Sequence, residues 1–367
     1  MGIADQAPPY VRRISPYQPG KPISELAREM GLNPSAIVKL ASNENPLGMS
    51  PLAKNAISAA LFEAPRYPDG NGFALKAALS EMTGVPATQI VLGNGSNDVL
   101  ELVARSFLAP GAEAVMSAHA FAVYPLATLA SGATPVQVAA REFGHDLDAM
   151  AAAITDRTRV VFIANPNNPT GTFVAGPQIE AFLARVPDTV LVVLDEAYTE
   201  YLADVDAYDS IAWLARFPNL LISRTFSKAY GLAGLRVGYA MGGAAVVDLL
   251  NRVRQPFNVN SLALAGAVAA LADQEFVARS VELNRRGMAQ VTAALADLGL
   301  TWLPSRGNFV TVKVGDAAAV NAGLLRRGVI VRPIAAYGMP EWLRVSIGLP
   351  EENARFIDAL RGVLADA

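Results

Sequence analysis

The sequence predicts an α/β protein with a large domain built on a mostly parallel sheet and a smaller α+β domain. From about residue 110 to 240, short apolar runs alternate with helical segments, and each run ends in a polar or glycine-containing loop. This alternation is typical of a parallel sheet sandwiched by helices. After residue 260 the pattern changes to a long helical stretch, three strand-like runs and a closing helix. We therefore expect two domains preceded by an N-terminal arm.

The expected boundaries are residues 1–40 for the arm, 41–258 for the large domain and 259–367 for the small domain. The arm is rich in proline and glycine and carries one short helical pattern, from Ser24 to Met30, with Ser24 as a candidate N-cap. Because a segment this short cannot bury a core of its own, we expect the arm to pack against the small domain.

The strands are expected where apolar residues run without interruption. In the large domain these runs are 90–92, 115–116, 136–138, 159–164, 190–194 and 220–222, with one more after residue 236. In the small domain we expect a helix over 261–298, strands at 308–314, 329–333 and 342–347, and a helix over 351–364. Ligands of such sheets bind beyond the carboxyl ends of the strands, so the loops there are the candidate site.

The composition argues against several classes of function. A net charge of -3, from 30 basic and 33 acidic residues, indicates no surface for nucleic acid. There is no cysteine for a disulfide framework, and with two histidines we expect no metal site. The N-terminus has no apolar signal segment, and the longest apolar run, 262–272, is too short to span a bilayer. We expect a cytoplasmic protein that acts on small molecules, without a nucleic-acid or membrane partner.

A lysine lies in a glycine-containing loop between two apolar runs, in SRTFSKAYGLAGLRVGYA (223–240). The hydroxyls of Thr225 and Ser227 and the guanidinium of Arg236 lie within eight residues of Lys228, and such groups suit a phosphate. A fixed amine beside a phosphate site is what an enzyme using pyridoxal 5'-phosphate (PLP) needs. Taken alone, the Ser-Lys pair fits a solvated surface lysine equally well.

Four other strand-end loops carry groups that complement this lysine. They are an anion cradle at Gly95, Ser96 and Asn97, an aromatic face at Phe121, an amide at Asn168, and a carboxylate with a nearby phenol at Asp195 and Tyr198. The cradle opens a helix, where backbone amides and the helix dipole favour an anion. The carboxylate of Asp195 follows a buried strand and is costly unless paired. Together the five loops fit a phosphorylated pyridine aldehyde.

These motifs and their order resemble the fold-type I PLP-dependent aminotransferases over essentially the whole chain. NPNNPTG, DEAY and SKAYGLAGLRVGY are highly specific as a set, and RYPDG, GNGSND and SPYQPGKP resemble most the histidinol-phosphate aminotransferase family. Two positions depart from many relatives: Asn97-Asp98 replaces Asp-Glu, and Phe121 replaces tyrosine. Neither change removes the backbone amides or the stacking face.

The resemblance implies a role for each candidate residue. Lys228 would form the Schiff base with the cofactor and then act as general base. Asp195 would pair with the pyridinium nitrogen, Tyr198 and Asn168 would bond the ring's phenolic oxygen, and Phe121 would stack on the ring. The phosphate would be held by Gly95, Ser96, Asn97, Thr225, Ser227 and Arg236.

The resemblance also implies partners. Tyr67 would reach the cofactor phosphate of a neighbouring subunit, which implies a homodimer. Arg332 and Arg344, with Tyr17 and Asn43, would bind the substrate, histidinol phosphate in one half-reaction and glutamate or 2-oxoglutarate in the other. Two arginines and a phenol suit a dianionic phosphate better than a carboxylate, although both must be accepted.

Other functions remain open at this point. An aromatic amino-acid aminotransferase is the closest alternative, and a threonine-phosphate decarboxylase of the same fold is a more distant one. A PLP-carrying regulator usually adds a basic helix-turn-helix domain, for which we expect no room. A nucleotide-binding enzyme is disfavoured because Asp98 replaces the third glycine of G-x-G-x-x-G and no G-x-x-x-x-G-K-[ST] loop occurs.

Overall fold

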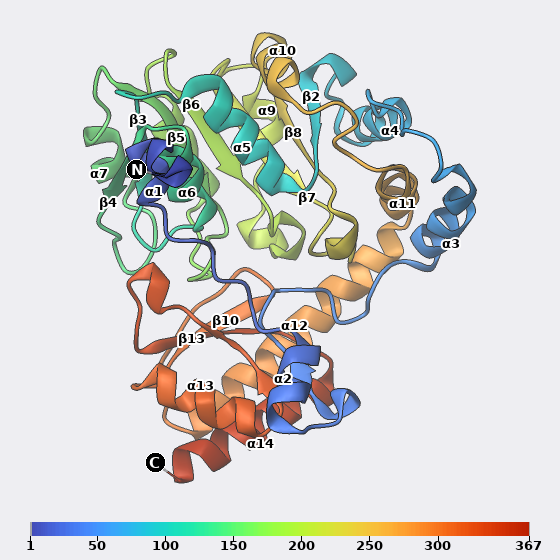
Figure 1. Cartoon of the computed structure of the whole chain (residues 1–367), viewed down its shortest axis with the longest axis vertical. Coiled ribbons are helices and arrows are strands. Elements are labelled where there is room, and N and C mark those ends of the chain that lie inside the picture. Colours follow the sequence, from blue (N-terminus) through green and yellow to red (C-terminus); the bar gives the residue numbers. More distant parts are fainter. Residues whose placement is uncertain (1, 367) are drawn as a thin grey trace.

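A seven-stranded sheet organises the larger part of the chain, shown in Figure 1, a computed structural model in which residues 2–366 are described. The strand order is β2 (Ile90–Gly93), β8 (Gly238–Gly242), β7 (Leu220–Thr225), β6 (Leu191–Asp195), β5 (Thr158–Ala164), β3 (Glu113–Ser117) and β4 (Thr134–Val138). Strand β8 runs antiparallel to β2 and β7, and the remaining neighbouring pairs are parallel. The predicted α/β class with a mostly parallel sheet is confirmed.

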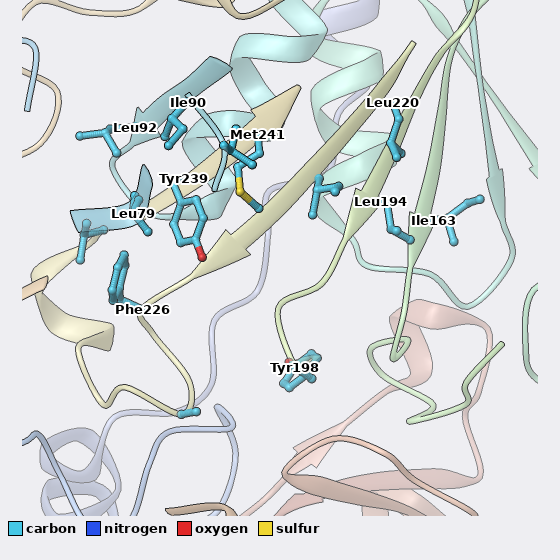
Figure 2. Packing of buried hydrophobic residues seen from close by; sticks show 14 of the residues in the cluster. Leu79, Ile90, Leu92, Ile163, Leu194, Tyr198, Leu220, Phe226, Tyr239 and Met241 are labelled. Atoms are coloured by element: carbon cyan, nitrogen blue, oxygen red, sulfur yellow. The ribbon is translucent and has the colours of Figure 1, made fainter. Parts of the chain in front are cut away.

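Helices cover both faces of this sheet (Figure 1). They are α3 (Pro51–Ala60), α4 (Phe73–Thr83), α5 (Ser96–Phe107), α6 (Val123–Ala130), α7 (Leu147–Ala152), α8 (Gly176–Leu183), α9 (Ser210–Trp213), α10 (Ala244–Val253) and α11 (Ser261–Ala272). Because side chains alternate along a strand, neighbouring residues enter different cores. Ile163 and Leu194 join the core drawn in Figure 2, whereas Phe162 and Val193 join the opposite one.

A second, four-stranded antiparallel sheet forms the smaller part of the molecule, at the bottom of Figure 1. Its order is β12 (Arg332–Pro333), β13 (Trp342–Ser346), β10 (Phe309–Lys313) and β9 (Trp302–Leu303). The accompanying helices are α12 (Gln274–Asp297), α13 (Ala317–Arg326) and α14 (Pro350–Ala365). Their buried faces form a separate apolar core with this sheet, which confirms the expected small α+β unit.

The helical stretch expected over 261–298 is broken at Asp273, and its two parts are bent by 79°. The Asp273 side chain accepts a hydrogen bond from the Phe276 amide and so caps a new helix. Before the bend, α11 packs on α3 and α4 and contributes Ala263 and Ala267 to a core of the large sheet. The domain boundary after residue 258 remains a prediction, and α11, which follows it, packs with the large-sheet unit.

The N-terminal arm contacts both parts of the molecule. Its helix α1 (Pro9–Arg12) lies against α6 of the large unit, while α2 (Ile23–Met30) packs through Leu26 and Ala27 near β11 (Val329–Ile330). Strand β11 itself pairs in parallel with β1 (Val38–Lys39). The prediction of Ser24 as N-cap was wrong, because Pro22, two residues earlier, has the extended backbone of an N-cap and the helix begins at Ile23.

In residues 2–366, no helix taken singly is both long enough and apolar enough to cross a membrane; the bent pair α11 and α12 meets these criteria only jointly.

Candidate active site

A cavity of about 260 Å³ lies at the carboxyl ends of β5, β6 and β7, where the small sheet and the arm approach the large unit. Most of the sequence-predicted site residues line it together: Tyr17, Asn43, Ser96, Asn97, Phe121, Asn168, Asp195, Tyr198, Thr225, Ser227, Lys228, Arg236, Arg332 and Arg344. The three parallel strands end side by side, so the loops that follow them meet at one edge of the sheet.

The amine of Lys228 lies inside this cavity and donates a hydrogen bond to the carbonyl oxygen of Ser42 over 3.1 Å. Burial, reinforced by the charge of Arg344, lowers the pKa of the Lys228 amine to about 7. A neutral amine is the form that attacks a carbonyl carbon. Near neutral pH the site therefore holds a substantial fraction of reactive lysine.

The carboxylate of Asp195 is buried at the end of β6. Its Oδ2 accepts a hydrogen bond of 2.8 Å from the hydroxyl of Tyr124, while its Oδ1 has no partner among the described residues. Burial raises the pKa of Asp195 to about 6, and the hydrogen bond from Tyr124 opposes this increase. A buried carboxylate oxygen without a donor is costly, so this atom is suited to a ligand's N–H.

The anion end of the cavity is built at the start of α5. Gly95 has φ 84° and ψ 163°, a conformation essentially limited to glycine. A Cβ atom at Gly95 would lie 2.5 Å from the Nη2 atom of Arg236, so the missing side chain is what lets the guanidinium approach the helix N-terminus. The absence of a side chain at Gly95 therefore makes room for the guanidinium of Arg236.

Tyr198 is held by Asn43, which comes from the segment after β1. The Asn43 Nδ2 atom donates to the Tyr198 hydroxyl oxygen over 2.9 Å, and its Oδ1 accepts from the Ser346 hydroxyl, also over 2.9 Å. Burial raises the pKa of Tyr198 to about 12, so its phenol stays protonated and can donate a hydrogen bond. The structure thus places Asn43 where it orients Tyr198.

Two arginines lie side by side on adjacent strands of the small sheet. Arg332 and Arg344 are directly paired in the antiparallel register of β12 and β13, so their side chains share one face. Arg344 is buried and donates to Asn168 Oδ1 over 2.5 Å and to the Ala41 carbonyl over 2.6 Å. The guanidinium of Arg332 lies 5.4 Å from the centre of the Tyr17 ring. Like charges placed directly opposite repel one another, which favours an anion between them.

Two predicted site residues, Gly95 and Tyr67, do not line the cavity, and Tyr67 lies elsewhere on the molecule. Its side chain is 83% exposed and stacks on Phe257, with ring centroids 4.7 Å apart. Tyr67 is not part of the cavity lining described above. A role for it in catalysis therefore requires a second copy of the chain and stays a prediction.

Sequence reasoning missed several residues that line the cavity. The most informative is Tyr124, and the others are Gly20, Ala41, Ser42, Glu44, Ala164, Pro166, Ala197 and Ala233. Tyr124 is the second residue of α6 and follows Phe121, which precedes the helix, by three positions; its amide donates to the Phe121 carbonyl oxygen over 3.1 Å. That spacing was the available signal, but nothing in it points to Asp195, which lies 71 residues further along.

Comparison with known proteins identifies the family. The sequence profile of the aminotransferase class I and II family matches residues 35–360. The chain belongs to this family. The aminotransferase class expected from the motifs is thereby confirmed.

Relatives within this family confirm the closer resemblance. The chain is 66% identical to histidinol-phosphate aminotransferase 1 of Thiobacillus denitrificans, over 99% of this chain and 95% of the relative. It is 64% identical to histidinol-phosphate aminotransferase 2 of Pseudomonas aeruginosa, over 98% of both chains. A crystal structure of the Sinorhizobium meliloti histidinol-phosphate aminotransferase in complex with pyridoxal-5'-phosphate superimposes with a TM-score of 0.90 at 30% identity, covering 98% of this chain and 97% of that one.

Proposed function

We propose that this aminotransferase uses PLP to transfer the amino group between histidinol phosphate and 2-oxoglutarate, as a step of histidine biosynthesis. Its relatives of that name match nearly the full chain. The observation that carries the proposal is the joint presence of Lys228 and Asp195 in one cavity, with anion-binding groups between α5 and β7.

The residues present fit PLP at each of its functional groups. The orphaned Oδ1 of Asp195 suits a protonated ring nitrogen, and Phe121 offers a ring face. The hydroxyls and amides near Ser96, Thr225 and Ser227, with the guanidinium of Arg236, suit a phosphate. When bound, PLP supplies an aldehyde that captures primary amines and a ring that accepts electrons released at the substrate's α-carbon.

Three side chains of the protein then have separate roles in the reaction. The neutral Nζ of Lys228 removes the proton from the substrate α-carbon and later returns a proton to the acceptor substrate. The ionised carboxylate of Asp195 would stabilise a protonated ring nitrogen. The hydroxyl of Tyr198 accepts a hydrogen bond from Asn43 and would donate to the ring's phenolic oxygen.

The substrate's anionic group is bound by the arginine pair. Because Arg332 and Arg344 lie directly opposite each other, a dianionic phosphate relieves their repulsion more fully than a monoanionic carboxylate does. Tyr17 closes this end of the cavity beside Arg332. This arrangement supports histidinol phosphate as the amino donor, while the same guanidinium groups also accept the carboxylate of glutamate.

Half-reaction spectroscopy tests this choice of substrate. The purified, PLP-loaded protein is mixed in turn with histidinol phosphate, tyrosine, phenylalanine and threonine phosphate, and the loss of visible absorbance is followed. We expect the fastest change with histidinol phosphate, and Arg332→Gln should slow it more than it slows the reaction with glutamate. A faster reaction with an aromatic amino acid would contradict the assignment.

The proposal includes a homodimer in which Tyr67 acts on the neighbouring site. It is supported by the exposure of Tyr67 together with Phe62 and Phe73, which are 87% and 77% exposed and would be covered by a second copy. Mixing refolded Lys228→Ala and Tyr67→Ala subunits should restore activity, because one hybrid site then holds both intact residues. Monomers in solution, or no recovery on mixing, would count against it. A cytoplasmic location stays a prediction from the sequence.

A further inference from the structure

Tyr124 touches two of the residues that the proposed function assigns to the cofactor ring. Its hydroxyl donates to Asp195 Oδ2 over 2.8 Å, and its ring packs perpendicular to that of Phe121, at an interplanar angle of 86° and a centroid distance of 5.8 Å. Tyr124 therefore supports both Asp195, proposed at the edge of the cofactor ring, and Phe121, proposed on the face of that ring.

The Tyr124 ring is itself firmly placed. It is fully buried and stacks on Phe162 of β5 at 4.8 Å with an interplanar angle of 4°. Its backbone carbonyl accepts a hydrogen bond from Thr128 within α6. A phenol held in this way donates in one fixed direction, so it also fixes the plane of the carboxylate that receives the bond.

The consequence for Asp195 follows from its two oxygen atoms. Tyr124 occupies Oδ2, whereas Oδ1 has no partner among residues 2–366. A carboxylate with one oxygen tied to a rigid donor cannot rotate to exchange its oxygens without losing a charge-assisted hydrogen bond. Oδ1 is thereby the oxygen left without a hydrogen bond and able to accept one from a ligand.

We propose that Tyr124 is a positioning residue, which orients Asp195 so that Oδ1 meets the ring nitrogen of PLP and supports Phe121 against the ring face. This inference rests on the proposed use of PLP. In this role Tyr124 acts through Asp195 and Phe121.

The test uses Tyr124→Phe, which keeps the stacked ring and removes only the hydroxyl. A hydrogen bond to a charged group contributes enough that PLP should bind about tenfold or more weakly, as measured by titration of the apoprotein with PLP. The visible circular dichroism of bound PLP should also fall, because the ring is held less firmly. Tyr239→Phe removes another buried phenol, from β8, and should leave both readouts unchanged.

An Asp195→Asn background separates positioning from a general structural role. If the phenol acts through the carboxylate, Tyr124→Phe should change PLP affinity far less there than in the wild-type protein. Equal losses in both backgrounds, or unchanged PLP affinity in the single variant, would overturn the inference. A wild-type protein that binds no PLP would instead refute the proposed function, so the two failures are distinguishable.

Discussion

Gly95→Ala offers a sharp test of the anion end of the site, because the contact that it would create is known. The new Cβ would lie 2.5 Å from Nη2 and 3.0 Å from Cζ of Arg236, so the guanidinium has to move. Gly95 also has the φ and ψ values that only glycine adopts readily. The backbone strain alone should lower the free energy of unfolding by about 1–3 kcal/mol.

The effect on PLP binding is separate from this strain, which is present with and without the cofactor. Displacing Arg236 removes a charge-assisted hydrogen bond to the phosphate, worth about 1.5–3 kcal/mol. At 1.4 kcal/mol per factor of ten, the Kd for PLP should rise ~10- to 150-fold. Equilibrium dialysis of the apoprotein with PLP measures this, and urea unfolding measures the stability loss.

Gly234→Ala is the matched control, since a Cβ at Gly234 meets no described atom within 4 Å. It should leave both the Kd and the unfolding free energy close to wild type. An unchanged Kd for PLP in a folded Gly95→Ala protein would refute the argument that Gly95 makes room for a phosphate-binding guanidinium.

The remaining predictions concern stability and pH. Gly231→Ala should lower the free energy of unfolding in urea by about 2–6 kcal/mol, because the new Cβ would overlap the Gly48 carbonyl oxygen and the φ angle of residue 231 is 71°. A loss below about 1 kcal/mol would contradict this prediction. Arg224→Met should lower the free energy of unfolding by about 3–5 kcal/mol, because it leaves the buried carboxylate of Glu196 unpaired. Adding Glu196→Gln to this variant should recover much of the lost stability, whereas additive losses would refute the pairing. Burial lowers the pKa of Lys228 from 10.5 to about 7, so between these pH values the unfolded apoprotein binds more protons at this residue than the folded one. The contribution of Lys228 to stability should therefore increase with pH over this range. Thermal unfolding of the apoprotein should show that Lys228→Met removes this increase, and an identical pH profile in the variant would contradict the argument.

The sequence was enough to predict the fold class and most of the site, because their signals are local. Buried parallel strands appear as apolar runs such as 190–194, and several site residues, among them Asn168, Asp195 and Lys228, follow such runs within a few positions. The rule that strand ends meet at one edge of the sheet then brings Asp195 and Lys228 together without further information. The structure confirms that juxtaposition.

Other features depended on contacts between distant segments. The break at Asp273 arises because its side chain caps the following turn and also accepts from the Ser50 hydroxyl, a partner in a far part of the chain. A helix pattern read along the sequence contains no such partner.

The amino-acid sequence by itself determined which chemical groups this protein carries and the edge of the sheet at which they gather, since periodicity and loop composition act over a few residues. Only the tertiary structure decided how those groups are oriented. Tyr124 reaches Asp195 across 71 positions, and Asn43 reaches Tyr198 across 155 positions and Ser346 across 303. Such bonds form because packing brings remote segments within about 3 Å of each other, a distance at which donor and acceptor geometry selects the partner.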